Sequence, residues 1–227
     1  MARKFTDIDH SRIDTLSDGI FAIALTLLGF DLIGAIKKAS EDEDLNQGLL
    51  HEWPIFFSFV MGFFVLYAIW YQYHVQSQFA GKPHAVMVWQ HGFGFMIAAL
   101  VPAGAALLGE SINTPNMSWA VFYFGLLIFI EGPVQLLFFF AMRRRPMTVT
   151  EDSPFTGAEY HKMGVLLNVI VTALGLISVV TALLYPWVAL VLYSLYLLTK
   201  VNPVASFNSS MPLMRRLLNI SEEAVEA

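Results

Sequence analysis

"SRIDTLSDGIFAIALTLLGFDL", residues 11–32, joins a charged and hydroxylated start to a long apolar run. The apolar run, from Ile13 to Ile36, is long enough to cross a membrane, which takes about 20 mostly apolar residues. Ser17 and Asp18 nevertheless lie inside its first turns. An ionisable side chain there is costly and is usually paired inside a helical bundle. This stretch therefore indicates both the fold class and the place to look for a functional site.

The composition of the whole chain is that of a polytopic membrane protein. Of its 227 residues, 56% are hydrophobic and 14% are charged, and the mean hydropathy is +0.60. A soluble domain of this size needs more charged surface. The sequence contains no cysteine, which excludes disulfides and thiolate metal sites within it. Asp7, Asp9 and Asp14 interrupt the basic start of a cleavable signal peptide, so no such signal is expected.

Six apolar stretches are predicted to form membrane-spanning helices. They are residues 13–36, 53–78, 85–109, 118–142, 163–184 and 186–198. The sequence therefore predicts an all-α bundle of six transmembrane helices within residues 1–202, followed by a cytoplasmic tail over residues 203–227.

The last two stretches have only "YPW" between them, without a polar turn. One continuous helix from residue 163 to residue 200 would be about 57 Å long at 1.5 Å per residue, far more than the hydrocarbon core of about 30 Å. A tight hairpin at residues 185–187 is therefore expected, with a short sixth helix.

Basic residues favour a topology with both termini in the cytoplasm. In that topology the inner segments hold all the lysines and arginines except Lys37 and Lys38. Such a bias is the positive-inside signal of membrane proteins. The outer loop that contains EDED, residues 41–44, is acidic. This loop is interpreted as a solvated loop or as an outer mouth that attracts cations.

The first predicted helix has two different sides at 100° per residue. Ile23, Leu27 and Phe30 share one face, and Thr26 lies at its edge. Asp18 lies about 140° from Ile23 on the same wheel. An apolar face of this kind occurs against lipid, in a core or along a pore, and its periodicity alone does not separate these three interpretations.

Asp18, Arg12, His74 and His91 are expected at one level of the bundle, near its cytoplasmic end. The hypothesis is that they form a hydrogen-bonded network that fixes the rotation of the first helix. Three alternatives remain: Arg12 extends to the interface, the two histidines bind a metal, or Asp18 transfers protons.

Glu131 lies near the middle of the fourth predicted span, two residues before Pro133. It is interpreted either as a hydrogen-bonded packing residue or as a carboxylate for ion coupling or proton relay. The sequence lacks the HExxH, GxSxG and P-loop motifs, so no enzyme activity is expected, and nothing in it suggests nucleic-acid binding.

The segment RIDTLSDG, residues 12–19, followed by AIALTL, residues 22–27, resembles the signature of the transmembrane protein 175 family of potassium channels. That family has an Arg-x-x-x-Phe-Ser-Asp-Gly motif in its first helix. A chain with one six-helix repeat resembles the prokaryotic members. Leu16 replaces the usual Phe, His91 stands near a usual Asn, and Phe30 is bulkier than the expected Leu.

The resemblance implies a homotetrameric, potassium-preferring channel in a prokaryotic plasma membrane. Potassium would be the permeant ion, the membrane lipid would surround the subunits, and no cofactor would be needed. Ile23 would form the main constriction, with Leu27 and Phe30 further out and Thr26 near the pore wall. The Arg12–Ser17–Asp18 group would pack against the second and third helices. Like the family, the sequence has no TVGYG filter.

Overall fold

The structure, a computed structural model, describes residues 10–79, 85–143 and 157–201, and these residues form seven helices. The helices are α1 (His10–Ala39), α2 (Leu45–His51), α3 (Trp53–Phe79), α4 (Ala85–Ser111), α5 (Met117–Met142), α6 (Gly157–Leu184) and α7 (Pro186–Val201). The predicted all-α class is confirmed. The short helix α2 was not predicted, and the expected tail, residues 203–227, lies outside the described residues.

Five helices are long and apolar enough to cross a membrane by length and composition: α1, α3, α4, α5 and α6. The apolar part of α7, Pro186–Leu197, is shorter. The 16 residues of α7 extend over about 24 Å, which is less than the full hydrocarbon core. Six spans therefore remain a prediction.

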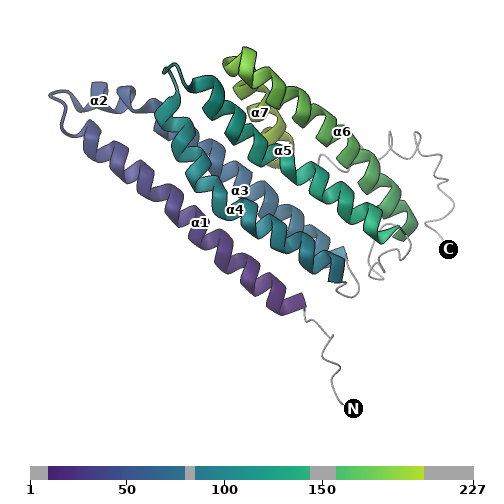
Figure 1. The fold of residues 1–227 in the computed structure, drawn as a ribbon. Coiled ribbons are helices and arrows are strands. Elements are labelled where there is room, and N and C mark those ends of the chain that lie inside the picture. Colours follow the sequence, from purple (N-terminus) through teal and green to yellow (C-terminus); the bar gives the residue numbers. More distant parts are fainter. Residues whose placement is uncertain (1–9, 80–84, 144–156, 202–227) are drawn as a thin grey trace.

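The long helices pack as an antiparallel bundle in which α1 and α6 occupy opposite edges (Figure 1). α1 packs against α3 and α4, whereas α6 packs mainly against α5 and also against α7. α7 also contacts α3 and α5. Because α1 lies at an edge, one long side of it faces away from the other helices of the chain.

Two short connections close the end of the bundle that carries α2. Asn113, between α4 and α5, has a φ of 65°, in the left-handed region that asparagine tolerates better than most residues. Tyr185 alone separates α6 from α7, in agreement with the predicted hairpin. Pro186 begins α7, a position where the missing backbone N–H costs nothing.

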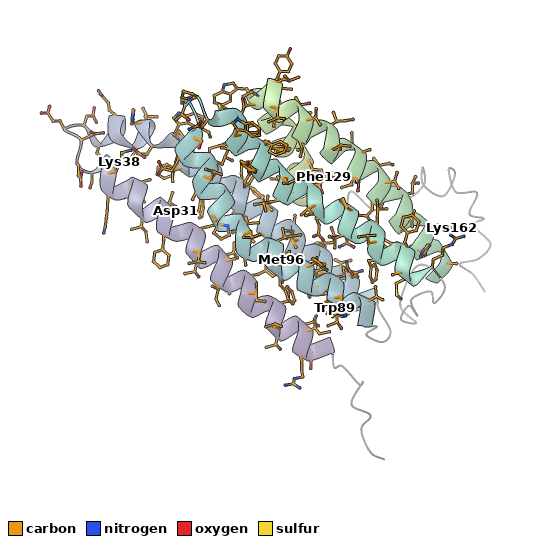
Figure 2. All side chains as sticks on the ribbon, viewed as in Figure 1. Asp31, Lys38, Trp89, Met96, Phe129 and Lys162 are labelled. Carbon is orange, nitrogen blue, oxygen red and sulfur yellow. The ribbon has the colours of Figure 1, made fainter. Side chains whose placement is uncertain are left out.

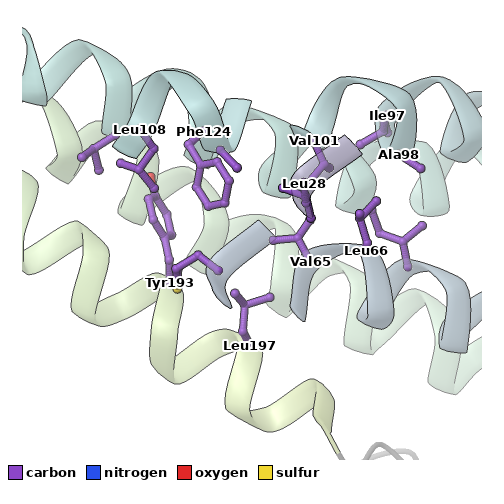
Figure 3. Close-up of a cluster of buried hydrophobic side chains, with 14 of the residues drawn as sticks. Leu28, Val65, Leu66, Ile97, Ala98, Val101, Leu108, Phe124, Tyr193 and Leu197 are labelled. Atoms are coloured by element: carbon purple, nitrogen blue, oxygen red, sulfur yellow. The ribbon is translucent and has the colours of Figure 1, made fainter. Parts of the chain in front are cut away.

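The main hydrophobic core joins α1 to its neighbours (Figure 3). Leu28 of α1, Leu66 of α3 and Val101 of α4 are at most 1% exposed. Gly62 of α3 lies where an added Cβ would be 2.9 Å from the Leu28 Cδ2 atom, so the small residue permits a close approach of α1 and α3. This contact fixes which side of α1 is buried.

Candidate functional site

The apolar stripe on α1, formed by Ile23, Leu27 and Phe30, points away from the rest of the helical bundle. Ile23 is 64% exposed and Phe30 is 62% exposed, and Leu27 is exposed too. Phe21 and Leu28, on the packed side of the same helix, are buried. Figure 2 shows a row of α1 side chains along this free edge of the bundle. The stripe is therefore available to lipid, to another copy of the chain or to an ion pathway.

Thr26 is exposed at the edge of this stripe, and its hydroxyl group already has a partner. The Oγ1 atom donates a hydrogen bond to the Ala22 carbonyl, 2.8 Å away. Such a bond to the preceding turn satisfies the hydroxyl hydrogen within the helix. The oxygen lone pairs of Thr26 are then the polar atoms that it presents at the surface.

The acidic residue Asp18 is held by a tryptophan that the sequence analysis did not identify. The Trp70 Nε1 atom of α3 donates a hydrogen bond to the Asp18 Oδ1 atom, 2.9 Å away. The His74 ring stacks on Trp70 with a centroid distance of 5.3 Å and an interplanar angle of 12°. Ser17, next to Asp18, is buried. These contacts attach the polar side of α1 to α3.

The four residues expected at one level thus lie in different surroundings. His74 joins Asp18 through Trp70, and Arg12 is exposed in the first turns of α1. His91 is buried on α4, where its Nδ1 atom lies 2.8 Å from the Met87 carbonyl oxygen. Within residues 10–79, 85–143 and 157–201, no group of three His, Asp or Glu side chains is placed to hold a metal, so the structure adds no support for a metal-binding role of the histidines.

Glu131 of α5 belongs to a second polar group, deeper in the bundle. Its Oε1 atom accepts hydrogen bonds from the Tyr73 hydroxyl, 3.0 Å away, and from the Gln135 Nε2 atom, 2.9 Å away. The Gln90 Nε2 atom donates to the Gln135 Oε1 atom at 2.6 Å and to the Gln76 Oε1 atom at 3.0 Å. Tyr73, Gln76 and Gln135 were not predicted as site residues, although polar groups in such apolar helices are a signal for pairing.

The end of the bundle beside α2 carries most of the described acidic groups. The Lys38 Nζ atom forms an ion pair with the Glu52 Oε1 atom at 2.6 Å (Lys38 is labelled in Figure 2). Asp44, part of the acidic loop, caps α2 by accepting a hydrogen bond from the Asn46 backbone N–H. Glu41, Asp42 and the neighbouring acids are exposed. The loop is therefore solvated, but one of its carboxylates also has a structural role.

Gly94 of α4 provides a test of the packing around Tyr73. A Cβ atom at Gly94 would overlap the Tyr73 ring and hydroxyl, whereas one at Gly92 would meet no atom within 4 Å. Gly94→Ala is therefore expected to be less stable than Gly92→Ala by about 1–2 kcal/mol, because the overfilled contact displaces the buried ring. Both variants gain the same helix propensity, so thermal melting in detergent isolates the clash. Equal melting temperatures for the two variants would contradict the Tyr73 placement.

Comparison with known proteins shows which sequences and folds the chain is similar to. Residues 12–102 match the family described as "Endosomal/lysosomal potassium channel TMEM175". A potassium channel of Chamaesiphon minutus is 34% identical over 109 residues, which cover 48% of this chain and 53% of the relative. One of Streptomyces collinus is 28% identical over 110 residues, covering 48% and 52%. The chain thus spans about half the length of the curated relatives that it matches.

The fold also matches a solved structure. The crystal structure of a lysosomal potassium-selective channel TMEM175 homolog from Chamaesiphon minutus superposes with a TM-score of 0.70. The match covers 85% of this chain and 96% of that one, at 20% sequence identity. The relatives are thus named as channels rather than enzymes. The resemblance of the first helix to the transmembrane protein 175 family is therefore confirmed, and this chain has the helical fold of a solved homolog from that family.

Proposed function

We propose that this chain is a subunit of a homotetrameric cation channel that conducts potassium passively and prefers it over sodium. In this proposal α1 of each subunit faces the central axis, and its apolar stripe lines the pore. The observation that carries the proposal is the exposed stripe on a helix whose polar edge is attached to α3 through Asp18 and Trp70. The choice of potassium as the conducted ion rests on the relatives, which are named potassium channels.

An apolar pore of this kind selects ions without a cage of carbonyl oxygens. Ile23 would form the narrowest ring, with Leu27 and Phe30 towards the end of α1 that leads to α2. A narrow apolar ring closes the pore by excluding water, and a wider one passes a partly hydrated ion. Since no oxygen ligands replace the hydration shell there, selectivity would depend on hydration cost and pore width and would be modest.

We further propose a prokaryotic plasma membrane as the location, with both termini in the cytoplasm. The described basic residues support this orientation, because Arg12, Arg143 and Lys162 lie at one end of the bundle. Lys37 and Lys38 lie at the opposite end, beside the acidic loop (Figure 2). Such a bias is typical of the positive-inside rule.

A proton- or ion-coupled secondary transporter is the second candidate function. Glu131 favours it, because a buried carboxylate in a membrane bundle is a common element of coupled transport. In that case Glu131 and Asp18 would bind the coupling ion.

Potassium flux into liposomes that contain the purified protein tests the two candidates. A channel is expected to give a current that reverses at the potassium equilibrium potential and does not saturate at low ion concentration. A saturable flux that depends on a proton gradient would support the transporter instead. Protein-containing liposomes without potassium flux of either kind would overturn both.

A further inference from the structure

Five buried polar side chains form one hydrogen-bonded network between α3, α4 and α5. They are Tyr73, Gln76, Gln90, Glu131 and Gln135, and the most exposed of them, Glu131, is only 8% exposed. None of these three helices contains a lysine or an arginine. A buried carboxylate between such helices needs hydrogen bonds or a proton to offset its loss of hydration.

The hydrogen bonds of this network are directed towards the Glu131 carboxyl group. Gln90 donates to Gln135, Gln135 donates to Glu131, and Tyr73 donates to Glu131. Donors from two different helices thus meet at the Glu131 Oε1 atom. Hydrogen bonds of this direction stabilise an ionised carboxylate.

The donors of this network do not satisfy all of its buried acceptor atoms. The Gln90 Oε1 atom is buried and has no hydrogen-bond partner among the described residues. Gln90 itself is 3% exposed. Because a buried acceptor without a donor is costly, the network would gain from one additional hydrogen. We propose that Glu131 is a proton-binding site, and that its protonation adds one hydrogen to this network and removes the buried negative charge.

The polar side chains also indicate from which end the proton enters. Gln76 lies three residues before the end of α3, and Gln90 lies five residues after the start of α4. The network therefore runs from Glu131 towards the end of the bundle where α3 connects to α4. The proton comes from a hydronium ion in the water at that end of the bundle. The hydronium ion becomes water, and the Glu131 carboxylate becomes a carboxylic acid.

Few other ionisable groups face Glu131 from the helices that surround it. The His91 ring of α4 packs on the ring of Tyr73, the hydrogen-bond donor to Glu131, with a distance of 4.5 Å between the ring centroids. Tyr196 of α7 lies within electrostatic range of Glu131. α6 presents Thr172 at this level, against Gly132. The ionisable residues of α6 fall within 159–162, and His161 lies beside Phe139, about two helical turns from Glu131.

The site is connected to the helix that anchors α1. Tyr73 follows Trp70 by three residues, so the two side chains lie about one turn apart on α3. Trp70 holds Asp18, and Tyr73 holds Glu131. Protonation weakens the charge-assisted bond from Tyr73 and thereby acts on the same segment of α3 that positions α1. This coupling to conduction rests on the proposed channel function, whereas proton binding does not.

Infrared difference spectroscopy of the purified full chain tests proton binding directly. The spectrum in alkaline buffer is subtracted from that in acidic buffer, first for the wild type and then for Glu131→Gln. The difference between these two results is expected to contain one carboxylic-acid carbonyl band. Glu110→Gln, at an exposed position near the end of α4, is the matched control and should leave that band in place. A result without the band means that Glu131 does not exchange a proton, and the proposal is then wrong.

A second variant keeps the test valid if Glu131→Gln does not assemble. Tyr73→Phe removes one donor to the Glu131 Oε1 atom, so the carbonyl band is expected to move to a higher wavenumber. An unmoved set of carbonyl bands in Tyr73→Phe would also overturn the proposal. Flux measurements in liposomes separate proton binding from its coupling to conduction. Acid is expected to change the potassium flux of the wild type, and Glu131→Gln should lose this response. Absence of all flux would contradict the channel but leave the infrared result intact.

Discussion

Replacing Ile23 by asparagine is expected to raise the potassium current at least about tenfold, equivalent to lowering the barrier to ion passage by about 1.4 kcal/mol. A ring of amide groups keeps water in a constriction that a ring of isoleucine side chains excludes. The same change is expected to reduce the preference for potassium over sodium, because amide oxygens replace part of the hydration shell of either ion. Currents and reversal potentials in reconstituted membranes, with potassium and sodium on opposite sides, measure both effects.

Ile177→Asn is the matched control for this experiment. Ile177 is 60% exposed, close to the 64% of Ile23, but it lies on α6 at the opposite edge of the bundle (Figure 1). If α6 faces lipid, the control adds a polar group without changing the pore, so current and selectivity per channel stay as in the wild type. An unchanged current in Ile23→Asn, in protein that assembles normally, would remove Ile23 from the ion pathway.

Removing the Asp18 carboxylate is expected to cost about 1–2 kcal/mol of stability and to disturb subunit assembly. Asp18→Ala leaves the Trp70 indole N–H without its acceptor and frees α1 to rotate on α3. Asp18→Asn keeps a carbonyl oxygen at the same place and should retain part of the stability. Melting temperature and the fraction of intact oligomer, both measured in detergent, report the loss.

A double-mutant cycle isolates the contact between these two side chains. Asp18→Ala, Trp70→Phe and the double variant should give a coupling energy of about 1–2 kcal/mol, as expected for a hydrogen bond between membrane helices. Asp31→Asn is the control, because Asp31 is an exposed acid on the same helix, near the end that leads to α2 (Figure 2). Additive effects of Asp18→Ala and Trp70→Phe would mean that the bond does not hold α1.

The helical fold was predictable because long apolar stretches have few structural options in a membrane. The start of α3 at Trp53 and the hairpin before Pro186 follow directly from apolar runs and from chain length. The seven-residue helix α2 was missed, since it lies in a polar loop and is too short for a periodic signal. Its capping residue, Asp44, was interpreted only as part of an acidic loop, either solvated or attracting cations, and not as a helix cap.

The contacts of the site were less predictable than the helices that carry them. The wheel of one helix places Ile23 and Asp18 on different sides, but it gives no register against neighbouring helices. Trp70 was not identified as a partner of Asp18, although an indole N–H needs an acceptor when the side chain is partly buried. Gln76 and Gln135 approach each other through Gln90 only after three helices have packed, so no single stretch of sequence indicates their network.

Thiol accessibility along α1 tests the central claim most directly, and the absence of cysteine from the sequence permits single introduced thiols. We expect a water-soluble, thiol-specific reagent to block the current of Ile23→Cys and Leu27→Cys. Ile177→Cys on α6 and the buried positions Ala24→Cys and Leu28→Cys should keep their current. Block at Asp18→Cys with full current at Ile23→Cys would place the polar edge in the ion pathway and would contradict a pore lined by the apolar stripe.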